Sequence, residues 1–354
     1  MRVGTLGIFQ NYLGQQSDAD MMALEMRLAL LTEELGFDSY WPPEHHFADY
    51  SACPDNVQFL SWVAGKTERI RLGTGAIIVP WNDPLRAAER MVMLDHLSGG
   101  RAILGLGRGL SRKEYGQFGI AMDEARGRFD EGAKMIIDAL ETGFIEGHGP
   151  CYHHPRAELR PRPLRSFQDR FYCVGMSPES VEAAARLGAT LMTLTQQPWE
   201  VYKEGTLKDY REHWAKHQSA PVPNPLVGDL MFCDESADLA EERAREYASN
   251  YFLTVVDHYE IMSDHFKDIK GYEHYSSSAE VFQAVGLEAA ANGYVELHTW
   301  GTPQQILEKL EARRALIGDF EMLLIPCYGG MSAELAEGSM RCFAQQVLPE
   351  LSSW

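Results

Sequence analysis

The sequence lacks the features that mark membrane, secreted and nucleic-acid-binding proteins. It has no apolar run of about 18 residues, the length that a membrane span needs. Its first residues, MRVGTLGIFQ, read as a strand and not as a charged leader before a long apolar stretch, so no secretory signal is expected. The formal net charge is −19, which argues against nucleic acid as a partner because phosphate binding needs a basic surface.

Paired cysteines are also absent. The six cysteines stand singly along the chain, and no two have the CxxC spacing. Neither a disulfide framework nor a structural zinc site is indicated, and a reducing, cytoplasmic compartment is the default expectation. No internal repeat and no low-complexity segment stands out.

What the sequence does contain is a regular alternation of strand and helix patterns. Leu24, Leu28, Leu31 and Leu35 fall at helical spacing, and Asp83 before Pro84 is typical of a helix start. About eight such strand-then-helix units follow one another, which indicates a parallel sheet. With 354 residues and 45% apolar side chains, the chain is predicted to be one α/β domain over 1–354, a closed (β/α)8 TIM barrel with insertions.

Two segments do not fit the alternation. Residues 145–170 are rich in Pro, His and Arg and are predicted to be a long loop, while residues 255–299 are rich in aromatic and Met side chains. We expect both to be insertions at the barrel mouth, where long loops shape a site. The uneven spacing of His148, His153 and His154 favours solvated polar side chains over a metal tract.

Glu44, His45 and His46 form the first candidate site, directly after the second predicted strand. In a parallel barrel the chemistry lies at the carboxyl ends of the strands, so this trio belongs on the reactive face. The alternative is a polar loop with one histidine bonded to backbone. A metal site is less well supported, because adjacent histidines on a strand point to opposite sides, and we expect no metal.

Two further motifs predict a phosphate site. GLGRGL (105–110) does not have the dinucleotide GxGxxG spacing, but its backbone N–H groups beside Arg108 can cradle a phosphate. Ser177 and Ser180 open a helix, and a helix N-terminus with hydroxyls attracts phosphate. A glycine turn with a surface arginine, and simple helix capping, are the alternatives.

Gly75 and Ala76 provide the last signal, because small residues near a strand end let a flat group lie close to the backbone. A bulge is the alternative. All these motifs fall on one barrel face, which favours a phosphorylated cofactor across the barrel mouth.

Several linked segments resemble the bacterial luciferase-like flavin-dependent monooxygenases in order and spacing. They are GFDSYWPPEHHF, RIRLGTGAIIVPWNDPLRAAERMVMLDHLSGGR, LGLGRGLSRKEYGQFG, YCVGMSPESVEAAARLG and WGTPQQILEKL. The resemblance implies a TIM barrel, usually dimeric, that uses FMN delivered reduced by a separate flavin reductase. It implies monooxygenation of a small organic substrate by O2 through a flavin hydroperoxide.

The resemblance also implies residue roles. Arg108 would bind the FMN phosphate, and His45, preceded by Glu44, would face the reacting edge of the flavin. Gly75–Ala76 would form a non-prolyl cis peptide under the isoalloxazine. The other implied cofactor contacts are Gly107, the backbones of Leu110 and Met176, the hydroxyls of Ser177 and Ser180, and Arg126 as a second cation.

The chain departs from the luciferase catalytic subunit at two positions. Gly107 stands where that subunit has a reactive cysteine, and Thr195 stands near its flavin-flanking tryptophan. These departures leave light emission and a long-chain aldehyde substrate open, whereas monooxygenation remains the expectation. Residues 255–299 would form an apolar wall that includes His298 and Trp300.

Three other functions compete with this one. An enzyme using the deazaflavin F420 would transfer hydride, but its longer anionic tail would need more basic residues at the mouth. A non-catalytic flavin-binding subunit would need no histidine at the flavin edge. A metal-dependent hydrolase barrel would lose its activity with EDTA.

Overall fold

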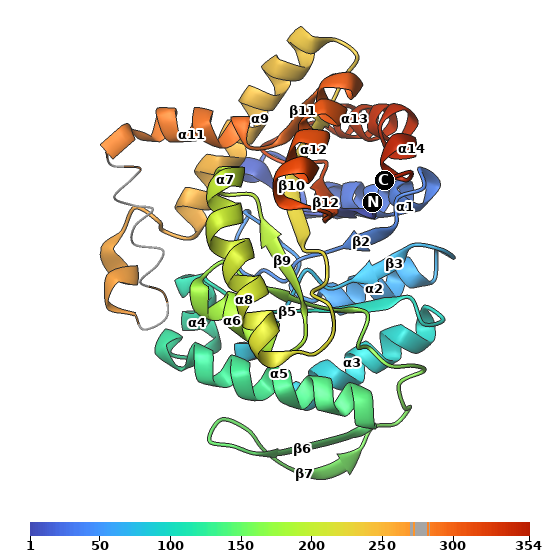
Figure 1. Cartoon of the computed structure of the whole chain (residues 1–354), viewed down its shortest axis with the longest axis vertical. Coiled ribbons are helices and arrows are strands. Elements are labelled where there is room, and N and C mark those ends of the chain that lie inside the picture. Colours follow the sequence, from blue (N-terminus) through green and yellow to red (C-terminus); the bar gives the residue numbers. More distant parts are fainter. Residues whose placement is uncertain (270–271, 273–281, 283) are drawn as a thin grey trace.

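The computed structural model describes residues 1–269, 272, 282 and 284–354. Eight parallel strands close into a barrel, because each pairs with the next in the ring and the last pairs with the first (Figure 1). The ring consists of β1 (Val3–Leu6), β2 (Ser39–Trp41), β3 (Arg71–Gly73), β5 (Ala102–Gly107), β8 (Phe171–Val174), β9 (Thr190–Leu194), β10 (Leu226–Cys233) and β12 (Glu321–Ile325). Two short strands, β4 (Ile77–Ile78) and β11 (Thr299–Gly301), pair with β5 and β10. The predicted TIM barrel is confirmed.

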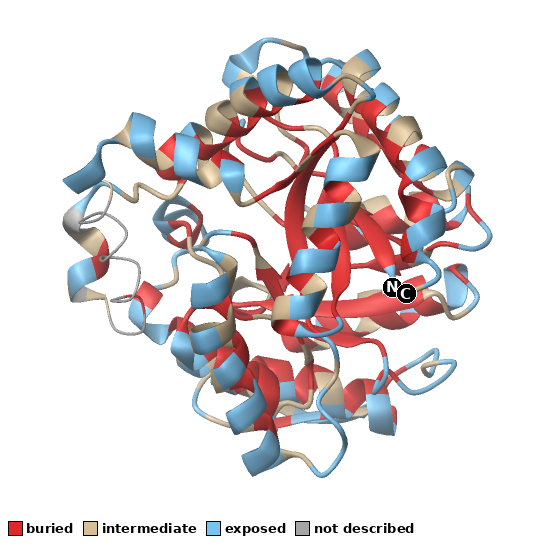
Figure 2. Cartoon of the chain, turned by 45° about the horizontal axis from the view of Figure 1, so that its top comes forward, coloured by how far each residue is buried: buried red, intermediate tan, exposed pale blue. Residues whose placement is uncertain are grey.

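Helices surround this barrel and bury one face each against it (Figure 2). The main ones are α1 (Asp18–Glu34), α2 (Asn56–Ala64), α3 (Pro84–Leu97), α5 (Ala125–Thr142), α6 (Pro178–Arg186), α8 (Lys208–His217), α9 (Ala237–His258), α12 (Pro303–Ile317) and α13 (Ala333–Gln346). Shorter helical segments are η1 (Tyr12–Gly14), η2 (Val79–Trp81), α4 (Arg112–Phe118), η3 (Met122–Glu124), α7 (Trp199–Tyr202), η4 (Lys203–Leu207), η5 (Asp264–Asp268), α11 (Leu287–Glu296) and α14 (Leu348–Leu351). As the sequence predicts, Asp83 caps α3 by accepting a hydrogen bond from the Arg86 amide.

The barrel interior is filled by large side chains, which fixes where a ligand can enter. The rings of Trp41 and Tyr172 meet edge to face with centroids 5.2 Å apart. Gly73 faces them, and a Cβ built there would lie 2.3 Å from the Trp41 ring. Because the barrel is packed in this way, open space remains only toward its rims.

Residues 145–170 contain a β-hairpin, so the predicted long loop is wrong. The strands β6 (Phe144–His148) and β7 (His153–Glu158) pair antiparallel. Figure 1 shows the hairpin beyond α5, at the end of the molecule away from α9. Glu131 of α5 anchors it by accepting hydrogen bonds from the backbone amides of Cys151 and Tyr152, at 2.9 and 2.8 Å. The hairpin thus covers the outside of the helix layer.

The described residues of the second predicted insertion include three helical segments. These are the end of α9, η5 and α11, while residues 270–271, 273–281 and 283 lie outside the described residues. Phe252 of α9 joins its parts, because its ring packs on Phe282 and Tyr294 at centroid distances of 5.3 and 5.2 Å. This segment therefore forms a wall beside the barrel.

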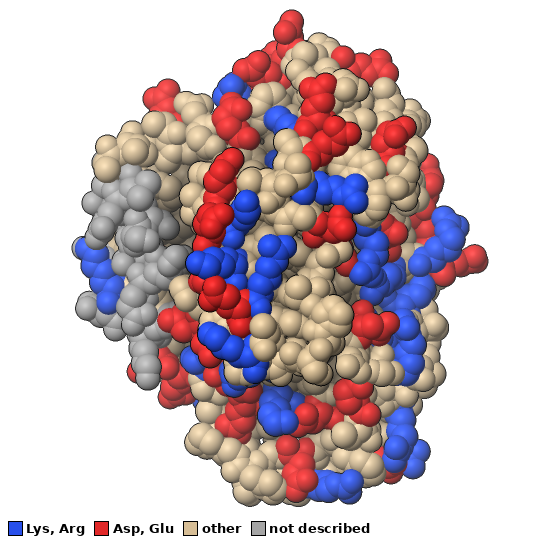
Figure 3. Space-filling view, viewed as in Figure 1, with Lys and Arg blue, Asp and Glu red and all other residues tan. Residues whose placement is uncertain are grey.

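The surface is mixed in charge on the face drawn in Figure 3, where acidic and basic side chains are interspersed. Among the described residues, no helix combines the length and the apolar character that crossing a membrane requires. All six cysteines are free thiols.

Candidate functional site

A cavity of about 250 Å³ lies at the carboxyl ends of the barrel strands. The structure brings nine of the predicted residues to its lining: Glu44, His45, Gly75, Ala76, Gly107, Arg108, Leu110, Met176 and Ser180. The other two, Ser177 and Arg126, lie behind Ser180 and bond to it. None of residues 145–170, all of which the structure describes, contributes to the lining, so that hairpin does not shape this mouth.

One end of the cavity is cationic and rich in unused donors. Arg108 is only 6% exposed, its guanidinium lies 4.0 Å from the centroid of the Tyr272 ring, and its Nη1 has no hydrogen-bond partner among the described residues. Arg126 donates to Ser180 Oγ at 2.9 Å, and Ser177 Oγ donates to the same hydroxyl at 3.1 Å. A buried arginine, a half-buried arginine and two bonded serine hydroxyls therefore lie at this end.

The electrostatics of this end favour an anion. Burial, followed by the positive charge of Arg108, lowers the pKa of Arg126, which has Asp130 as a partial counter-charge 3.5 Å away. Ser177 begins α6, yet its hydroxyl does not cap that helix. The helix start adds partial positive charge, and buried donors without acceptors are costly. A phosphate group would satisfy both needs, so the residues present fit a phosphorylated cofactor.

The floor beside this end is built from small residues. The peptide bond between Gly75 and Ala76 is cis, as the resemblance implies. Asn56 of α2 donates to the Ala76 carbonyl at 3.1 Å, and the Gly75 amide donates to the Pro42 carbonyl at 2.9 Å. A Cβ on Gly107 would approach Ile78 Cδ1 to 3.0 Å. The floor is thus flat and held from below.

His45 stands at the edge of the same cavity and is held by residues that the sequence did not reveal. Its Nδ1 lies 3.1 Å from Glu114 Oε1, and its Nε2 lies 3.4 Å from the Tyr259 hydroxyl. Burial would raise the pKa of Glu114, but the charge and hydrogen bond of His45 and the backbone amide of His46 lower it overall. An ionised Glu114 accepts the proton on Nδ1, which leaves Nε2 for exchange with a neighbour.

A third histidine stands next to this pair. The ring of His258 lies 5.4 Å from that of His45, and burial followed by the charge of His45 lowers the pKa of His258 to about 3. Ligand atoms of His45, Glu114 and His258 all lie within 4.8 Å of one another. Two imidazoles and a carboxylate can hold a transition metal, so this trio is a candidate metal group beside the cavity, which His45 and Glu114 line.

The side chains of Glu44 and His46, the other two members of the candidate trio, make their hydrogen bonds away from the His45 ring. The Glu44 carboxylate accepts hydrogen bonds from the Ile78 amide at 3.0 Å, the Trp81 indole at 2.7 Å and the Asn82 amide at 2.8 Å. His46 Nε2 lies 3.3 Å from Glu44 as well. Because these partners occupy the carboxylate, Glu44 fixes the turn after β4 and is placed as a positioning residue.

The other end of the cavity is apolar and aromatic. Its walls include Tyr50, Leu230, Tyr251, Phe252, Val255, Ile261, Phe282, Tyr294 and Ile325. His298 lines it, as predicted, and so does Thr195. Trp300 does not, because its ring packs under Lys309, 3.9 Å from the Nζ atom, so its predicted place in the wall is wrong. We call this end of the cavity the aromatic chamber.

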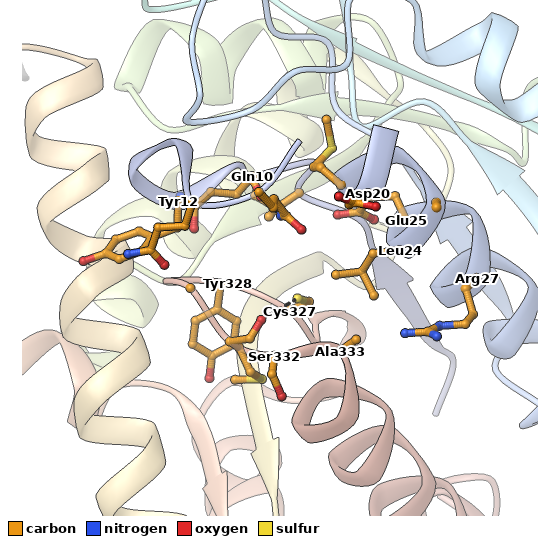
Figure 4. A pocket seen from close by; sticks show the side chains of 17 residues that line it. Gln10, Tyr12, Asp20, Leu24, Glu25, Arg27, Cys327, Tyr328, Ser332 and Ala333 are labelled. Atoms are coloured by element: carbon orange, nitrogen blue, oxygen red, sulfur yellow. Dashed lines mark hydrogen bonds between the residues drawn. The ribbon is translucent and has the colours of Figure 1, made fainter. Parts of the chain in front are cut away.

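A second cleft, of about 420 Å³, lies between α1 and residues 327–333. Figure 4 shows Leu24 and Glu25 of α1 on one side and Cys327 and Tyr328 on the other. Burial raises the pKa of Glu25 to about 7, and its carboxylate accepts a hydrogen bond from the Phe9 amide at 2.7 Å. None of the predicted site residues lines this cleft and its described lining contains a single arginine, Arg27, so the barrel-mouth cavity is the candidate site.

Fold and cavity together define a TIM-barrel protein with an anion pocket and an aromatic chamber side by side at its mouth. The family model described as luciferase-like monooxygenase matches residues 1–319, and the chain belongs to this family. The alkanal monooxygenase alpha chain of Photobacterium leiognathi is 26% identical over 345 residues, which cover 95% of each chain. The monooxygenase RslO1 from Streptomyces bottropensis has a similar structure, with a TM-score of 0.78, 27% identity and coverage of 99% and 100% of the two chains.

Two more distant structures share the fold. The oxygenating constituent of 3,6-diketocamphane monooxygenase from Pseudomonas putida, solved with FMN, has a TM-score of 0.76 and 15% identity, and covers 99% of this chain and 98% of its own. An F420-dependent secondary alcohol dehydrogenase has a TM-score of 0.72 and 17% identity, with 98% of each chain covered. The same fold thus occurs in a monooxygenase component solved with FMN and in an F420-dependent dehydrogenase.

Proposed function

We propose that this protein is an FMN-dependent monooxygenase that receives reduced FMN from a separate flavin reductase and oxidises a small organic substrate with O2. The observation that carries the proposal is the pair Arg108 and Arg126 next to the aromatic chamber, because both have buried nitrogens with no acceptor among the described residues. A phosphate tail fits the first region and an organic substrate fits the second.

Named residues would hold the cofactor. Arg108, Ser180 and Ser177 would bind the phosphate, with Arg126 behind them and the backbones of Gly107, Leu110 and Met176 alongside. Gly75 and Ala76 would lie under the flat ring system. When bound, reduced FMN supplies the electrons with which O2 is activated for oxygen transfer.

The protein's own side chains would transfer protons and keep water out of the site. His45, with Nδ1 bonded to ionised Glu114, holds Nε2 where it can give or take a proton through the Tyr259 hydroxyl. The aromatic chamber excludes water, which protects a reactive oxygen donor from unproductive decay.

Paired titrations with FMN and riboflavin test the phosphate pocket, because these ligands differ only in the phosphate. We expect FMN to bind more tightly, and Arg108→Gln to weaken FMN binding about tenfold to a hundredfold, since a hydrogen bond to a charged group contributes about 1.5–3 kcal/mol. Arg86→Gln, at an arginine 67% exposed on α3, is the control and should leave binding unchanged. Equal affinity for riboflavin and FMN contradicts the assignment, and F420 titrated in parallel tests the deazaflavin alternative.

Turnover is tested with an unrelated flavin reductase, isotopically labelled O2 and a panel of organic compounds. We expect the oxidised product of one organic compound to carry the isotope label. In His45→Ala, this labelled product should be lost while FMN binding persists. If product formation is unchanged in His45→Ala, the role given to His45 is wrong.

The proposal includes a homodimer. Met93 and Leu97 lie one helical turn apart on α3 and are 46% and 55% exposed, which offers apolar surface for a second copy. Light scattering on a size-exclusion column measures the mass in solution, and a monomer at all concentrations contradicts this part.

A further inference from the structure

A buried carboxylate–imidazole pair stands in the wall of the aromatic chamber. Asp229 lies on β10 and is 1% exposed, and His298, just before β11, is 2% exposed. Because β11 pairs with β10, the two side chains meet, and His298 Nδ1 contacts Asp229 Oδ1 in a short hydrogen bond. The sequence predicted His298 in this wall but did not predict Asp229 as its hydrogen-bond partner.

The far side of Asp229 is fully used by other groups. Arg313 of α12 donates to Asp229 Oδ2 at 2.5 Å, and the Thr299 hydroxyl donates to the same oxygen at 2.5 Å. Burial would raise the pKa of Asp229, but the charge of Arg313 and the interaction with His298 lower it overall. Asp229 is therefore an anchored carboxylate whose remaining oxygen faces the imidazole.

This arrangement fixes the tautomer of His298. An ionised carboxylate can only accept, so the proton between the two side chains belongs to Nδ1. The backbone amide of Leu230 also lies 3.2 Å from Nδ1, but the carboxylate is nearer and charged. Nε2 then carries a lone pair, and it has no hydrogen-bond partner in the described part of the chain although it is buried.

The side chains around His298 Nε2 indicate which kind of ligand this nitrogen can bond. His298 lines the cavity, with the Tyr294 ring 4.3 Å from its own and Thr195, whose buried Oγ1 is likewise without a partner among the described residues, in the same lining. Burial raises the pKa of Tyr294, so that phenol stays neutral. The titratable and charged groups packed around the imidazole are thus Asp229 from β10, Arg313 from α12 and Tyr294 from α11.

The geometry points to His298, oriented by Asp229, as the general base that removes the hydroxyl proton of a phenolic or enolic substrate bound in the aromatic chamber. This assignment rests on the proposed function and adds the substrate class to it. The chamber walls are aromatic and aliphatic, which suits a flat ring, and a purely hydrocarbon substrate would leave a buried base without a use.

The proton transfer balances within the site. The substrate O–H bond breaks, an Nε2–H bond forms, and the products are a phenolate or enolate and an imidazolium. Asp229 stabilises the imidazolium through Nδ1, while Arg313 and Thr299 keep that carboxylate in place. Loss of the proton raises the electron density on the substrate carbons, which favours attack on an electrophilic oxygen.

The test uses the whole protein without flavin and 4-nitrophenol as the probe, because its phenolate is yellow and its phenol is nearly colourless. We expect the probe bound to the wild type to ionise at a lower pH than in solution, by about one unit or tenfold in the ionisation constant. The net charge of −19 disfavours an anion and would raise the pH at which the bound probe ionises. A lowered ionisation pH therefore cannot come from the overall charge of the protein.

His298→Asn is the informative variant, because the asparagine amide can still donate to Asp229 but offers no base. It should bind the probe without lowering its ionisation, whereas His96→Asn, at an exposed histidine of α3, should behave as the wild type. Should His298→Asn fail to fold, the 15N shifts of His298 in the wild type with saturating probe report the same proton transfer.

Two results overturn the assignment: 4-nitrophenol does not bind the wild type, or its ionisation in His298→Asn equals that in the wild type. FMN titration of both proteins separates this from the proposed function. If the wild type does not bind FMN but His298 still ionises the probe, the monooxygenase proposal is refuted, whereas the assignment of His298 as a base stands.

Discussion

His258 is buried and its pKa lies far from the ordinary value of histidine, so its contribution to the pH dependence of stability is about 2 kcal/mol. Burial and then the charge of His45 lower its pKa to about 3. Its ring stacks on Tyr50 with centroids 4.3 Å apart, and its Nε2 has no partner within the described residues. In the folded protein the imidazole is therefore uncharged at neutral pH.

The sign of the pH effect follows from the depressed pKa. Below about pH 6.5 the unfolded chain binds a proton at His258 that the folded chain rejects until about pH 3. The unfolded state then holds more protons, so stability falls as the pH falls. One proton contributes up to about 1.4 kcal/mol per pH unit, so the loss at this position between about pH 7 and pH 5 is about 2 kcal/mol.

His258→Phe tests this value, because phenylalanine keeps a ring on Tyr50 but does not titrate. The measurement is the free energy of unfolding from urea denaturation at both pH values. The variant should lose about 2 kcal/mol less than the wild type on acidification, and His96→Phe, at an exposed position, should follow the wild type. If wild type and His258→Phe lose the same free energy, the buried neutral state of His258 is refuted.

Three further outcomes are expected. Glu114→Gln keeps an oxygen for the His46 amide but loses the charge that orients His45, so kcat should fall about tenfold to a hundredfold at unchanged FMN affinity; an unchanged kcat contradicts the role of Glu114. Gly73→Ala places a Cβ 2.3 Å from the Trp41 ring and should lower the free energy of unfolding by about 1–3 kcal/mol or prevent folding. Gly338→Ala, in α13 with open space around it, should instead raise it by about 0.5–1 kcal/mol, so equal effects of the two would contradict the packing described. Product formation should survive EDTA with no stoichiometric metal by elemental analysis; loss of activity on chelation would assign the His45, Glu114 and His258 cluster to a metal.

Some site residues were predictable because the barrel rule carries them to one place. The carboxyl ends of parallel strands share a face, so the motifs that follow predicted strands had to meet. His45, Arg108 and Ser180 do line one cavity. To predict that these residues meet, the order of the strands mattered more than their register or their exact bounds.

Other residues could not be found from the sequence. Glu114 lies on a short helix and Tyr259 just after a long one, and nothing local marks either as a partner of His45. Glu44 is adjacent to His45 in sequence, but its carboxylate accepts hydrogen bonds from the Trp81 indole and from the Ile78 amide of β4. Hydrogen-bond partners are set by packing, which adjacency does not report.

The hairpin was missed for a related reason. Residues 153–158 are mostly exposed, so they have no apolar alternation to indicate a strand, and prolines are frequent in the flanking sequence. The strand pairing is stabilised from outside, by backbone bonds to β6 and by Glu131 of α5. The secondary structure of such a segment depends on the residues against which it packs.

The sequence by itself determined the barrel, because strand and helix periodicities, caps and turn residues are local properties that repeat about eight times. It also determined which strand ends carry imidazole, guanidinium and hydroxyl groups. Only the tertiary structure decided how these groups are charged and bonded, since the pairing of His45 with Glu114 and of His298 with Asp229 joins residues 69 positions apart in each case. The physical reason is that burial and a neighbouring charge, both products of packing, decide where a proton resides.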